Sequence, residues 1–363
     1  SNTMSKLIAG LMKGSFHERD SIYDPAVGLG GFFVEIGNSI SRKEFQTIKF
    51  IGDEINSDIA SLCRMNLIMN GIYNSEIHTS DSILSPSVKA FSIDISVCEP
   101  PFSVHRTFEN NNLKVPEYLK IKSNDSTSQF FQLINSRLKS DGFAYIVVPE
   151  AFFNTSRTSK IRKALINSDL IDYIIDMPAG LGLKSNIKIS IVALNKNKPS
   201  FALDKVTFYN ARANGNYQTR ESEKDTDGIK YSNLADAIND AQKGGSNSLK
   251  EILVNDLHIK RIVIEKERIE RNNYELSSNL YLSTVSELFE DIVEKEEKVY
   301  KLKDLVIEKK FRSVSKKDID ETGKYPFIRI KNLSDSFKSF HLKTTNSILF
   351  NDVKESIGKL IVA

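Results

Sequence analysis

A glycine-rich turn lies near the start of the chain, directly after the short apolar run Ile22-Tyr23. Residues 24–33 read Asp-Pro-Ala-Val-Gly-Leu-Gly-Gly-Phe-Phe and lead into a stretch with helical character. Glycine permits positive φ angles and a close approach of the backbone, and the first turn of a helix leaves N–H groups that can face a ligand. The turn predicts a nucleotide-like cofactor, although many strand-to-helix turns use glycine for packing alone. The candidate cofactor residues here are Asp24, Pro25, Ala26, Gly28, Gly30 and Gly31.

Acidic side chains follow the next two apolar runs. Glu54 stands at the spacing at which a carboxylate accepts the two hydroxyls of a bound ribose. Asp81, followed by Ser82, is placed where it could accept a hydrogen bond from an adenine amino group. The alternative is local, because an acid at the start of a helix is stabilised by the helix dipole and Asp81 with Ser82 suits a turn or cap.

Two consecutive prolines follow the fourth apolar run, in the segment Cys98-Glu99-Pro100-Pro101-Phe102. An exocyclic amino group of a DNA base is a poor nucleophile because its lone pair is delocalised into the ring. A side-chain oxygen of Glu99 and the backbone carbonyl of Pro100 can accept its N–H groups and draw charge onto the nitrogen. Paired prolines fix the backbone, and Phe102 can stack on a base that has left the duplex. The alternative is a rigid turn with a buried phenylalanine.

These motifs together predict a methyltransferase that binds S-adenosylmethionine and acts on an amino group of a DNA base. The pair Asp24-Pro25 is absent from the usual dinucleotide-binding turn, and no Lys, Tyr or His arrangement supports hydride transfer. Cys63 and Cys98 give neither a disulfide framework nor a metal-ligand spacing. We therefore predict no metal site and a reducing compartment, the cytoplasm.

The first 200 residues alternate between short apolar runs and amphipathic segments, which predicts a doubly wound, mostly parallel sheet with helices on both faces. Ligands of such sheets bind beyond the carboxyl ends of the strands, and all four motifs stand at strand ends. The predicted strands are Ile22-Tyr23, Ile48–Gly52, Ile77–Thr79, Ile93–Cys98, Phe143–Val148, Ile171–Ile175 and Ile187–Leu194. The predicted helices lie near 32–42, 56–70, 127–139 and 156–167, with Gly71 as a C-terminal cap.

The pattern changes after residue 200. Residues 211–250 are polar and predict a flexible insertion, whereas 251–271 read as helical. A second amphipathic helix is expected within 283–300, as a spacer. From residue 301 onward, short mixed segments suggest a further, β-rich domain.

Length and charge limit the possible classes. A chain of 363 residues with 40% hydrophobic residues favours two or three globular domains, and no run approaches the roughly 18 apolar residues of a membrane span. Residues 301–363 carry 14 Lys and Arg against 8 Asp and Glu, while the whole chain has a net charge of +3. This basic end predicts phosphate contacts with double-stranded DNA, or alternatively an ordinary solvated surface.

The motifs resemble those of the N6-adenine DNA methylases, the modification subunits of type I restriction systems and their fused relatives. The resemblance covers residues 3–282 and extends to the Gly-x-Glu segment at Gly52, to Gly142–Glu150 and to Asn273–Ser277. It implies a class I methyltransferase domain over 1–282 with a seven-stranded sheet. It also implies that residues 24–31 hold the methionine part of S-adenosylmethionine, that Glu54 holds its ribose and Asp81 its adenine, and that Thr3 matches a threonine before the first helix.

Residues 301–363 resemble the start of a target-recognition domain of a specificity subunit, a partial α+β domain that we expect to be truncated here. The resemblance rests on residues 302–306 and 323–328. It implies specificity and restriction subunits or domains as partners, with adenine N6 of DNA as the methyl acceptor.

One residue departs from the family pattern. The catalytic tetrad of the family begins with Asn before Pro-Pro-Phe or Pro-Pro-Tyr, whereas this chain carries Glu99. A carboxylate still accepts hydrogen bonds, but glutamate is one methylene longer, and a misplacement of about 1 Å can cost on the order of 100-fold in rate. The sequence therefore leaves two hypotheses open: a DNA methyltransferase, or a catalytically impaired component that binds cofactor and DNA.

Overall fold

The computed structural model describes residues 2–17, 20–102, 104, 114–177, 187–212, 231–243, 250–254 and 257–282, and the backbone of four short strands after residue 318. The chain separates into two compact units, Ser1–Ser283 and Thr284–Ala363. The candidate site lies in the first unit. The helix expected within 283–300 lies outside the described residues.

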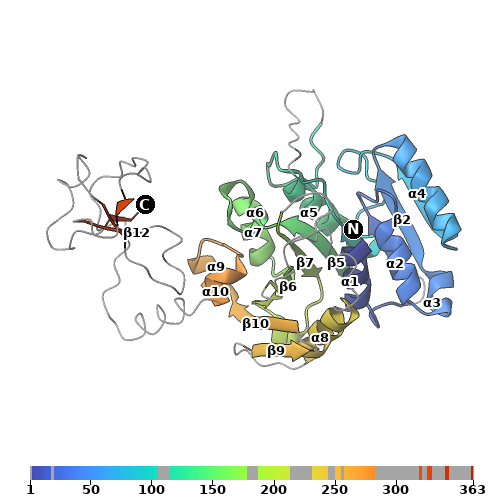
Figure 1. The fold of residues 1–363 in the computed structure, drawn as a ribbon. Coiled ribbons are helices and arrows are strands. Elements are labelled where there is room, and N and C mark those ends of the chain that lie inside the picture. Colours follow the sequence, from blue (N-terminus) through green and yellow to red (C-terminus); the bar gives the residue numbers. More distant parts are fainter. Residues whose placement is uncertain are drawn as a thin grey trace. The chain divides into compact units, whose positions relative to one another are not determined.

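A ten-stranded sheet forms the centre of the first unit, in the order β3-β2-β1-β4-β5-β7-β6-β8-β10-β9 (Figure 1). The pairings make β7 and β10 antiparallel to all the other strands. The strands are β1 (Ser21–Asp24), β2 (Lys49–Glu54), β3 (Ser75–Thr79), β4 (Ile93–Cys98), β5 (Leu138–Pro149), β6 (Ile171–Asp176), β7 (Ile189–Asn195), β8 (Lys205–Asn210), β9 (Lys250–Val254) and β10 (Leu257–Glu265).

The predicted doubly wound sheet is confirmed, and its first seven strands are the seven predicted runs. The central strands read as continuous apolar stretches because both of their faces are covered: Ile189–Leu194 of β7 and residues 144–148 of β5 are all buried. The sheet is larger than the predicted seven strands, because β8, β10 and β9 extend it beyond β6.

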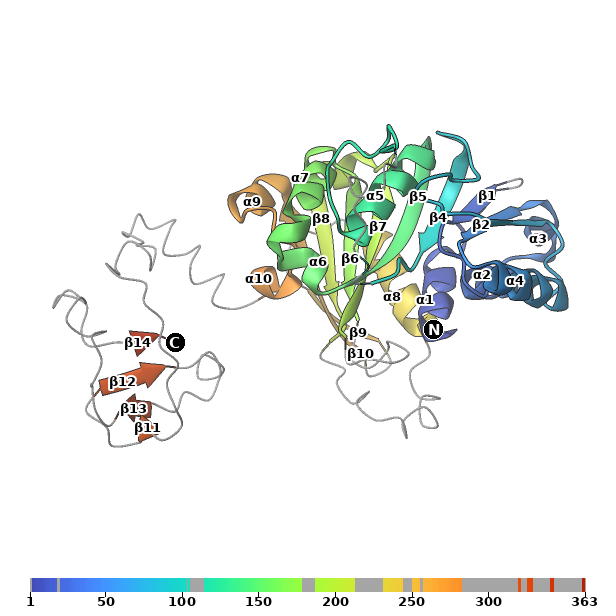
Figure 2. The same ribbon diagram turned by 90° about the horizontal axis from the view of Figure 1, so that it is seen from above.

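Two layers of helices cover the sheet. Buried side chains of α1, α2, α4 and α8 form one apolar cluster with the strands, and those of α5, α6, α7, α9 and α10 form the other. Figure 2 shows α5, α6 and α7 on one side of the strands and α1 and α8 on the other. The helices are α1 (Asn2–Leu11), α2 (Gly31–Ser39), α3 (Arg42–Thr47), α4 (Ser57–Met69), α5 (Ser126–Arg137), α6 (Ala151–Asn154), α7 (Ser159–Asn167), α8 (Tyr231–Lys243), α9 (Lys266–Arg271) and α10 (Ser278–Leu282), with 3-10 turns η2 (Ser156–Thr158) and η3 (Ser200–Ala202).

Helix α4 begins and ends at capping residues. The Asn56 side chain accepts hydrogen bonds from the N–H groups of Asp58 and Ile59, which satisfies two donors of the first turn. After the last residue, Gly71 adopts a φ of +76° and donates its N–H to the carbonyl of Ile68. The predicted glycine cap is confirmed, and this cap fixes the length of the helix that follows the Glu54 strand.

Two predictions after residue 200 are wrong. Within the expected flexible insertion, residues 231–243 form α8, which buries Leu234 and Ile238 and packs against α1. The stretch 251–271 was expected to be helical, but Lys250–Val254 forms β9 and Leu257–Glu265 forms β10, and of its described residues only Lys266–Arg271 form a helix. The reason is tertiary: β8 offers a free edge, and β10 pairs with it from Lys260 to Glu265.

The second unit contains a four-stranded sheet in the order β11-β13-β12-β14. Strand β12 pairs antiparallel with β13 and parallel with β14. Its strands are β11 (Ile319–Asp320), β12 (Tyr325–Ile328), β13 (Phe340–Leu342) and β14 (Ile361–Val362). Its assignment as the start of a recognition domain stays a prediction.

Candidate functional site

The candidate site lies at the carboxyl ends of β2, β1 and β4. These strands are neighbours and run parallel, with Asp24 in register with Gly52 and Tyr23 with Ser96. Because the strands share one direction, the residues that follow them meet at one edge of the sheet. The structure therefore brings together the glycine turn, Glu54 and Glu99.

The glycine turn is held by hydrogen bonds to the neighbouring strand. The Val27 N–H donates to the carbonyl of Asp53 at 3.1 Å, and the Gly28 N–H donates to Glu54 Oε2 at 3.2 Å. Gly28 and Gly30 have φ angles of +55° and +80°, a conformation that other residues rarely adopt.

The two glycines face different surroundings. A Cβ at Gly30 would lie 3.0 Å from Cys63 Sγ and 3.1 Å from Leu67 Cδ2, so this glycine lets α4 pack closely. A Cβ at Gly28 would meet nothing nearer than 4.0 Å. The backbone at Gly28 therefore has open space in front of it, which is what a bound ligand requires.

Glu54 is fixed by backbone donors on both carboxylate oxygens. Oε2 accepts from Gly28, and Oε1 accepts from the N–H of Asn56 at 2.9 Å. Helix α4 also holds the glycine turn, because Asn66 Nδ2 donates to the carbonyl of Leu29 at 2.7 Å. Asn66 was not predicted as a site residue, although it lies in residues 52–67, which resemble the family.

Asp24 is almost completely buried, with 1% of its surface exposed. Its Oδ1 accepts the Ala26 N–H at 2.9 Å, which closes the Asp-Pro-Ala turn. Burial raises the pKa of Asp24 to about 8, and the nearby carboxylates of Glu99 and Glu54 act in the same direction, against the hydrogen bond from Ala26. Within the described part of the chain, neither Asp24 nor Glu54 forms an ion pair. An uncompensated acidic site of this kind favours a cationic ligand.

Asp81 takes part in the turn after β3. Its Oδ1 accepts the N–H groups of Ile83 and Leu84 at 3.1 and 3.3 Å, and Ser82 is buried. The local alternative, a turn aspartate, is therefore present in the structure. A hydrogen bond from Asp81 to a bound adenine stays a prediction.

Asp53 is a buried residue of this region to which the sequence analysis gave no role. Its Oδ2 accepts the hydroxyl of Tyr23 at 2.5 Å and the N–H of Ser87 at 3.1 Å. The Asp53 carboxylate thus joins β1, β2 and the segment after β3, and so fixes the relative positions of the strand ends.

Ile55 was not predicted either. It follows Glu54 directly and has 64% of its surface exposed, which gives an apolar surface beside the predicted ribose contact.

The tetrad begins where β4 ends. Pro100 is buried, Glu99 and Phe102 are half-buried, and Phe102 packs against the apolar cluster that contains α1. Ser126 Oγ, in the first turn of α5, donates to the carbonyl of Pro101 at 2.7 Å. The Pro101 carbonyl is thus engaged within the protein, and the Pro100 carbonyl stays the predicted backbone acceptor. Thr3 lies in α1, and its side chain is outside the described residues.

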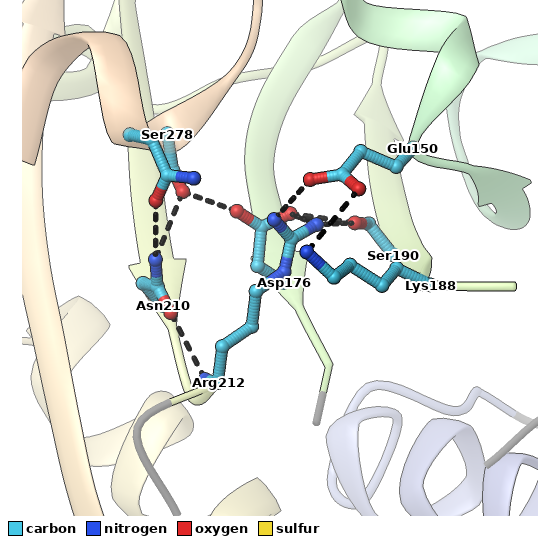
Figure 3. A network of polar contacts seen from close by, with 8 residues as sticks. Glu150, Asp176, Lys188, Ser190, Asn210, Arg212 and Ser278 are labelled. Atoms are coloured by element: carbon cyan, nitrogen blue, oxygen red, sulfur yellow. Dashed lines mark hydrogen bonds and ion pairs between the residues drawn. The ribbon is translucent and has the colours of Figure 1, made fainter. Parts of the chain in front are cut away.

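A network of charged and hydroxyl side chains occupies the continuation of the same sheet edge, at the ends of β5, β6 and β8 and the start of β7 (Figure 3). Arg212 Nη1 lies 2.5 Å from Glu150 Oε1, and its Nη2 lies 3.2 Å from Asp176 Oδ1. Asp176, 2% exposed, also accepts from Ser190 Oγ at 2.5 Å and from the Ser278 hydroxyl.

The network joins four strands to α10 and was not predicted. Its sequence signals were indirect: Glu150 ends one segment that resembles the family, and Ser278 directly follows another. Arg212, together with Lys188 at 3.8 Å from Glu150 Oε2, balances the charge of the two carboxylates without a ligand.

A cavity of about 1030 Å³ lies at the opposite ends of the central strands from the candidate site. It is lined by Phe143 and Asn195 from the strands and by Asp236 and Asp240 from α8. It contains none of the predicted site residues. In the described part of the chain, no group of His, Cys, Asp and Glu has the arrangement of a metal site, and no helix is long and apolar enough to cross a membrane.

Comparison with known proteins decides the family. The family model described as N-6 DNA Methylase matches residues 2–289. The chain belongs to the N-6 DNA methylase family.

Methylase relatives come from several prokaryotes. The chain is 27% identical over 301 residues to the type I restriction enzyme MjaVIII methylase subunit of Methanocaldococcus jannaschii. The aligned part covers 78% of this chain and 49% of that protein. It is 23% identical to the MpnII methylase subunit of Mycoplasma pneumoniae, over 78% of this chain and 52% of that protein. The chain thus spans about half the length of these relatives.

Solved structures of methylase subunits share the fold. A type I methyltransferase subunit from Streptococcus thermophilus superimposes with a TM-score of 0.59 at 24% identity, covering 76% of this chain and 57% of that one. The EcoKI M protein superimposes with a TM-score of 0.56 at 16% identity, over 76% and 65% of the two chains. The predicted membership of the N6-adenine methylase family is confirmed.

Proposed function

We propose that this N-6 DNA methylase binds S-adenosylmethionine and transfers the methyl group to the N6 amino group of adenine in double-stranded DNA. The observation that carries the proposal is the meeting of three features at neighbouring strand ends: the Gly28 turn bonded to Glu54, the buried Asp24, and the Glu99–Phe102 loop. Because DNA is the proposed substrate, we propose the cytoplasm as the compartment.

The residues present fit the cofactor. The open space at Gly28 leaves room for a ligand beside the turn, and the carboxylates suit the positive charges of the sulfonium and ammonium groups. Glu54 already accepts two backbone N–H groups, but each carboxylate oxygen has a second acceptor position, so both can still accept ribose hydroxyls. When bound, the cofactor supplies a methyl group on a cationic sulfur.

The residues of the tetrad would act on the base. The side chain of Glu99 and the carbonyl of Pro100 would accept the two N–H groups of adenine N6, which raises the electron density on that nitrogen. The nitrogen would gain the methyl group as the carbon–sulfur bond breaks, with the bonding electrons left on sulfur, and it would release one proton to water. Phe102 would stack on the extruded base, and the Ser126 bond to Pro101 holds the loop in place during the reaction.

Calorimetry with S-adenosylmethionine tests cofactor binding. Glu54→Ala removes the proposed hydrogen bonds from the ribose, so we expect affinity to fall roughly 10- to 100-fold, the worth of about 1.5–3 kcal/mol for a charge-assisted bond. The matched control is Glu267→Ala, which removes an exposed carboxylate from α9. Equal affinities of the wild type and Glu54→Ala would exclude Glu54 from the site.

Phe102 variants test recognition of the base. A duplex with 2-aminopurine at the target position gains fluorescence when that base leaves the stack. Phe102→Ala should weaken the extruded state by about 1–3 kcal/mol, whereas Phe102→Tyr retains the aromatic face and should behave like the wild type. An unchanged signal in Phe102→Ala would make the ring a packing residue. The recognition sequence for this duplex comes from sequencing modified bases in the DNA of cells that express the protein.

A second candidate function rests on Glu99, which replaces the tetrad asparagine. A longer acceptor in this loop would suit a component that binds cofactor and DNA with little methylation. Glu99→Asn separates the two, since a gain of methylation would show that the rest of the site is competent. For either function we propose specificity and restriction subunits or domains as partners, because the relatives are methylase subunits of type I restriction enzymes.

A further inference from the structure

Three carboxylates converge where β1, β2 and β4 end. Asp24 and Glu54 lie on adjacent strands, and Glu99 follows β4 on the other side of β1. The electrostatic effect of Glu99 reaches Asp24 and the buried Cys98 thiol, raising the pKa of both, although burial is the larger cause in each case. Since Tyr23 is in register with Ser96, Glu99 follows the strand next to Asp24 and stands at the same strand ends as the proposed cofactor site.

The three carboxylates differ in burial and in position. Asp24 is buried and bonded to the Ala26 N–H, and both oxygens of Glu54 are engaged by backbone donors. Glu99 is half-buried and opens the loop proposed to hold the acceptor amine. In methyl transfer the sulfur and the amine face each other across the methyl group, with reacting atoms about 3–3.5 Å apart. A residue that contacts the amine thus lies within a few ångströms of the sulfonium.

We propose that Glu99 makes the cofactor site selective for the charge on sulfur, so that the protein binds S-adenosylmethionine in preference to the demethylated product. The inference rests on the proposed function. The two ligands share the nucleoside and the amino acid, and differ in the methyl group and in the positive charge that it places on sulfur. A carboxylate near that sulfur stabilises the cation and gains nothing from the neutral thioether.

The size of the effect follows from Coulomb's law. At a separation of about 6 Å and an effective dielectric constant between about 20 and 40, one unit charge changes the affinity of an ion roughly 10- to 100-fold. The neutral asparagine that the family carries at this position lacks this term. Selectivity at Glu99 would reduce competition from the demethylated product, at the cost of a less well-placed acceptor in the tetrad.

The test is the ratio of dissociation constants for S-adenosylhomocysteine and S-adenosylmethionine, measured by calorimetry on the whole chain. Glu99→Gln keeps the length of the side chain and removes its charge, and Glu99→Asn removes the charge with the residue that the family uses. Both should lower the ratio at least about tenfold, chiefly through weaker binding of S-adenosylmethionine. Glu99→Asp keeps the charge and should retain most of the preference. Glu267→Gln, an exposed carboxylate of α9, is the matched control and should leave the ratio unchanged.

The outcomes separate the inference from the function on which it rests. If the wild type binds neither ligand, the proposed cofactor site itself is wrong. If the wild type binds both and the ratio is the same in Glu99→Gln and Glu99→Asn, the site stands and the role of Glu99 is overturned. A drop in ratio that also occurs in Glu267→Gln would assign the effect to overall charge and would equally overturn it.

Discussion

Among the residues that the structure describes, the carboxylates of Asp24 and Glu54 at the ends of β1 and β2 accept only backbone N–H groups, whereas those of Glu150 and Asp176 at the ends of β5 and β6 lie against Arg212. Both regions belong to one edge of one sheet. In the first region burial and neighbouring carboxylates raise the pKa of Asp24 to about 8.

The difference shows how the same residue types serve two purposes. A carboxylate paired with a guanidinium and hydroxyls is complete and adds cohesion between strands. Buried carboxylates that face one another without a cation raise one another's pKa, so Asp24 keeps its proton near neutral pH until a positive ligand favours its ionised form. The position of the cations, more than the presence of carboxylates, thus distinguishes the two regions. We call Asp24 and Glu54 with the glycine turn the binding region, and Glu150, Asp176 and Arg212 the bracing region.

The largest effect should follow from breaking the bracing region. Arg212→Met would leave Asp176 buried with only hydroxyl donors and should lower the free energy of unfolding by about 3–5 kcal/mol, measured by urea denaturation. Lys188→Met is the control: Lys188 lies 3.8 Å from Glu150 and is half exposed, so its loss should change stability little. Equal losses in the two variants would mean that Arg212 and Asp176 are not coupled.

The pH dependence of stability should test the buried carboxylate of Asp24 in the binding region. Asp24 has a folded pKa of about 8 against 3.8 in the unfolded chain, so between these values the folded protein keeps a proton that the unfolded chain releases. Stability without ligand should therefore fall as pH rises from about 5 to 8, by at most about 1.4 kcal/mol per pH unit from this residue. Thermal unfolding at several pH values should show a smaller slope in Asp24→Asn, and identical slopes would contradict the assignment.

The smallest effect compares two glycines within the binding region. Gly30→Ala meets Cys63 and Leu67 at a positive φ and should destabilise the fold by more than the roughly 1–2 kcal/mol of a left-handed residue alone. Gly28→Ala should lose only that conformational term in stability, yet weaken cofactor binding because its methyl group enters the open space. Measuring melting temperature and ligand affinity for both variants tests this, and a reversed pattern would exchange their roles.

Much of the fold could be predicted because burial leaves a simple pattern. Runs such as Ile93–Cys98 and Ile189–Leu194 are buried at almost every position, and most of their residues are apolar. Strand β10 lacked that signal, since Lys260 and Arg261 interrupt its apolar residues and its pairing with β8 decides its conformation. Helix α8 was hidden for a similar reason: its few apolar residues are sufficient only because α1 offers a surface.

The residues of the candidate site were predictable or not for the same reason. The glycine turn and Glu54 are local motifs with characteristic spacing, so their meeting through Gly28 followed from the strand order. Arg212 and Asp176 are 36 residues apart and follow no motif, and only the folded sheet makes them partners. Asp81 shows a limit of another kind, because one carboxylate suits a turn and a ligand equally well in the sequence.

The bond between Ser126 and Pro101 has a consequence for how this family can diverge. The Ser126 hydroxyl donates to the Pro101 carbonyl, and the Ser126 N–H donates to the Val104 carbonyl. Ser126 therefore fixes both ends of the segment between Val104 and Ser126. The entropy of closing such a loop grows only logarithmically, and doubling its length costs about 0.6 kcal/mol. Insertions between Val104 and Ser126 can therefore accumulate over evolution, while the tetrad Glu99–Phe102 keeps its position.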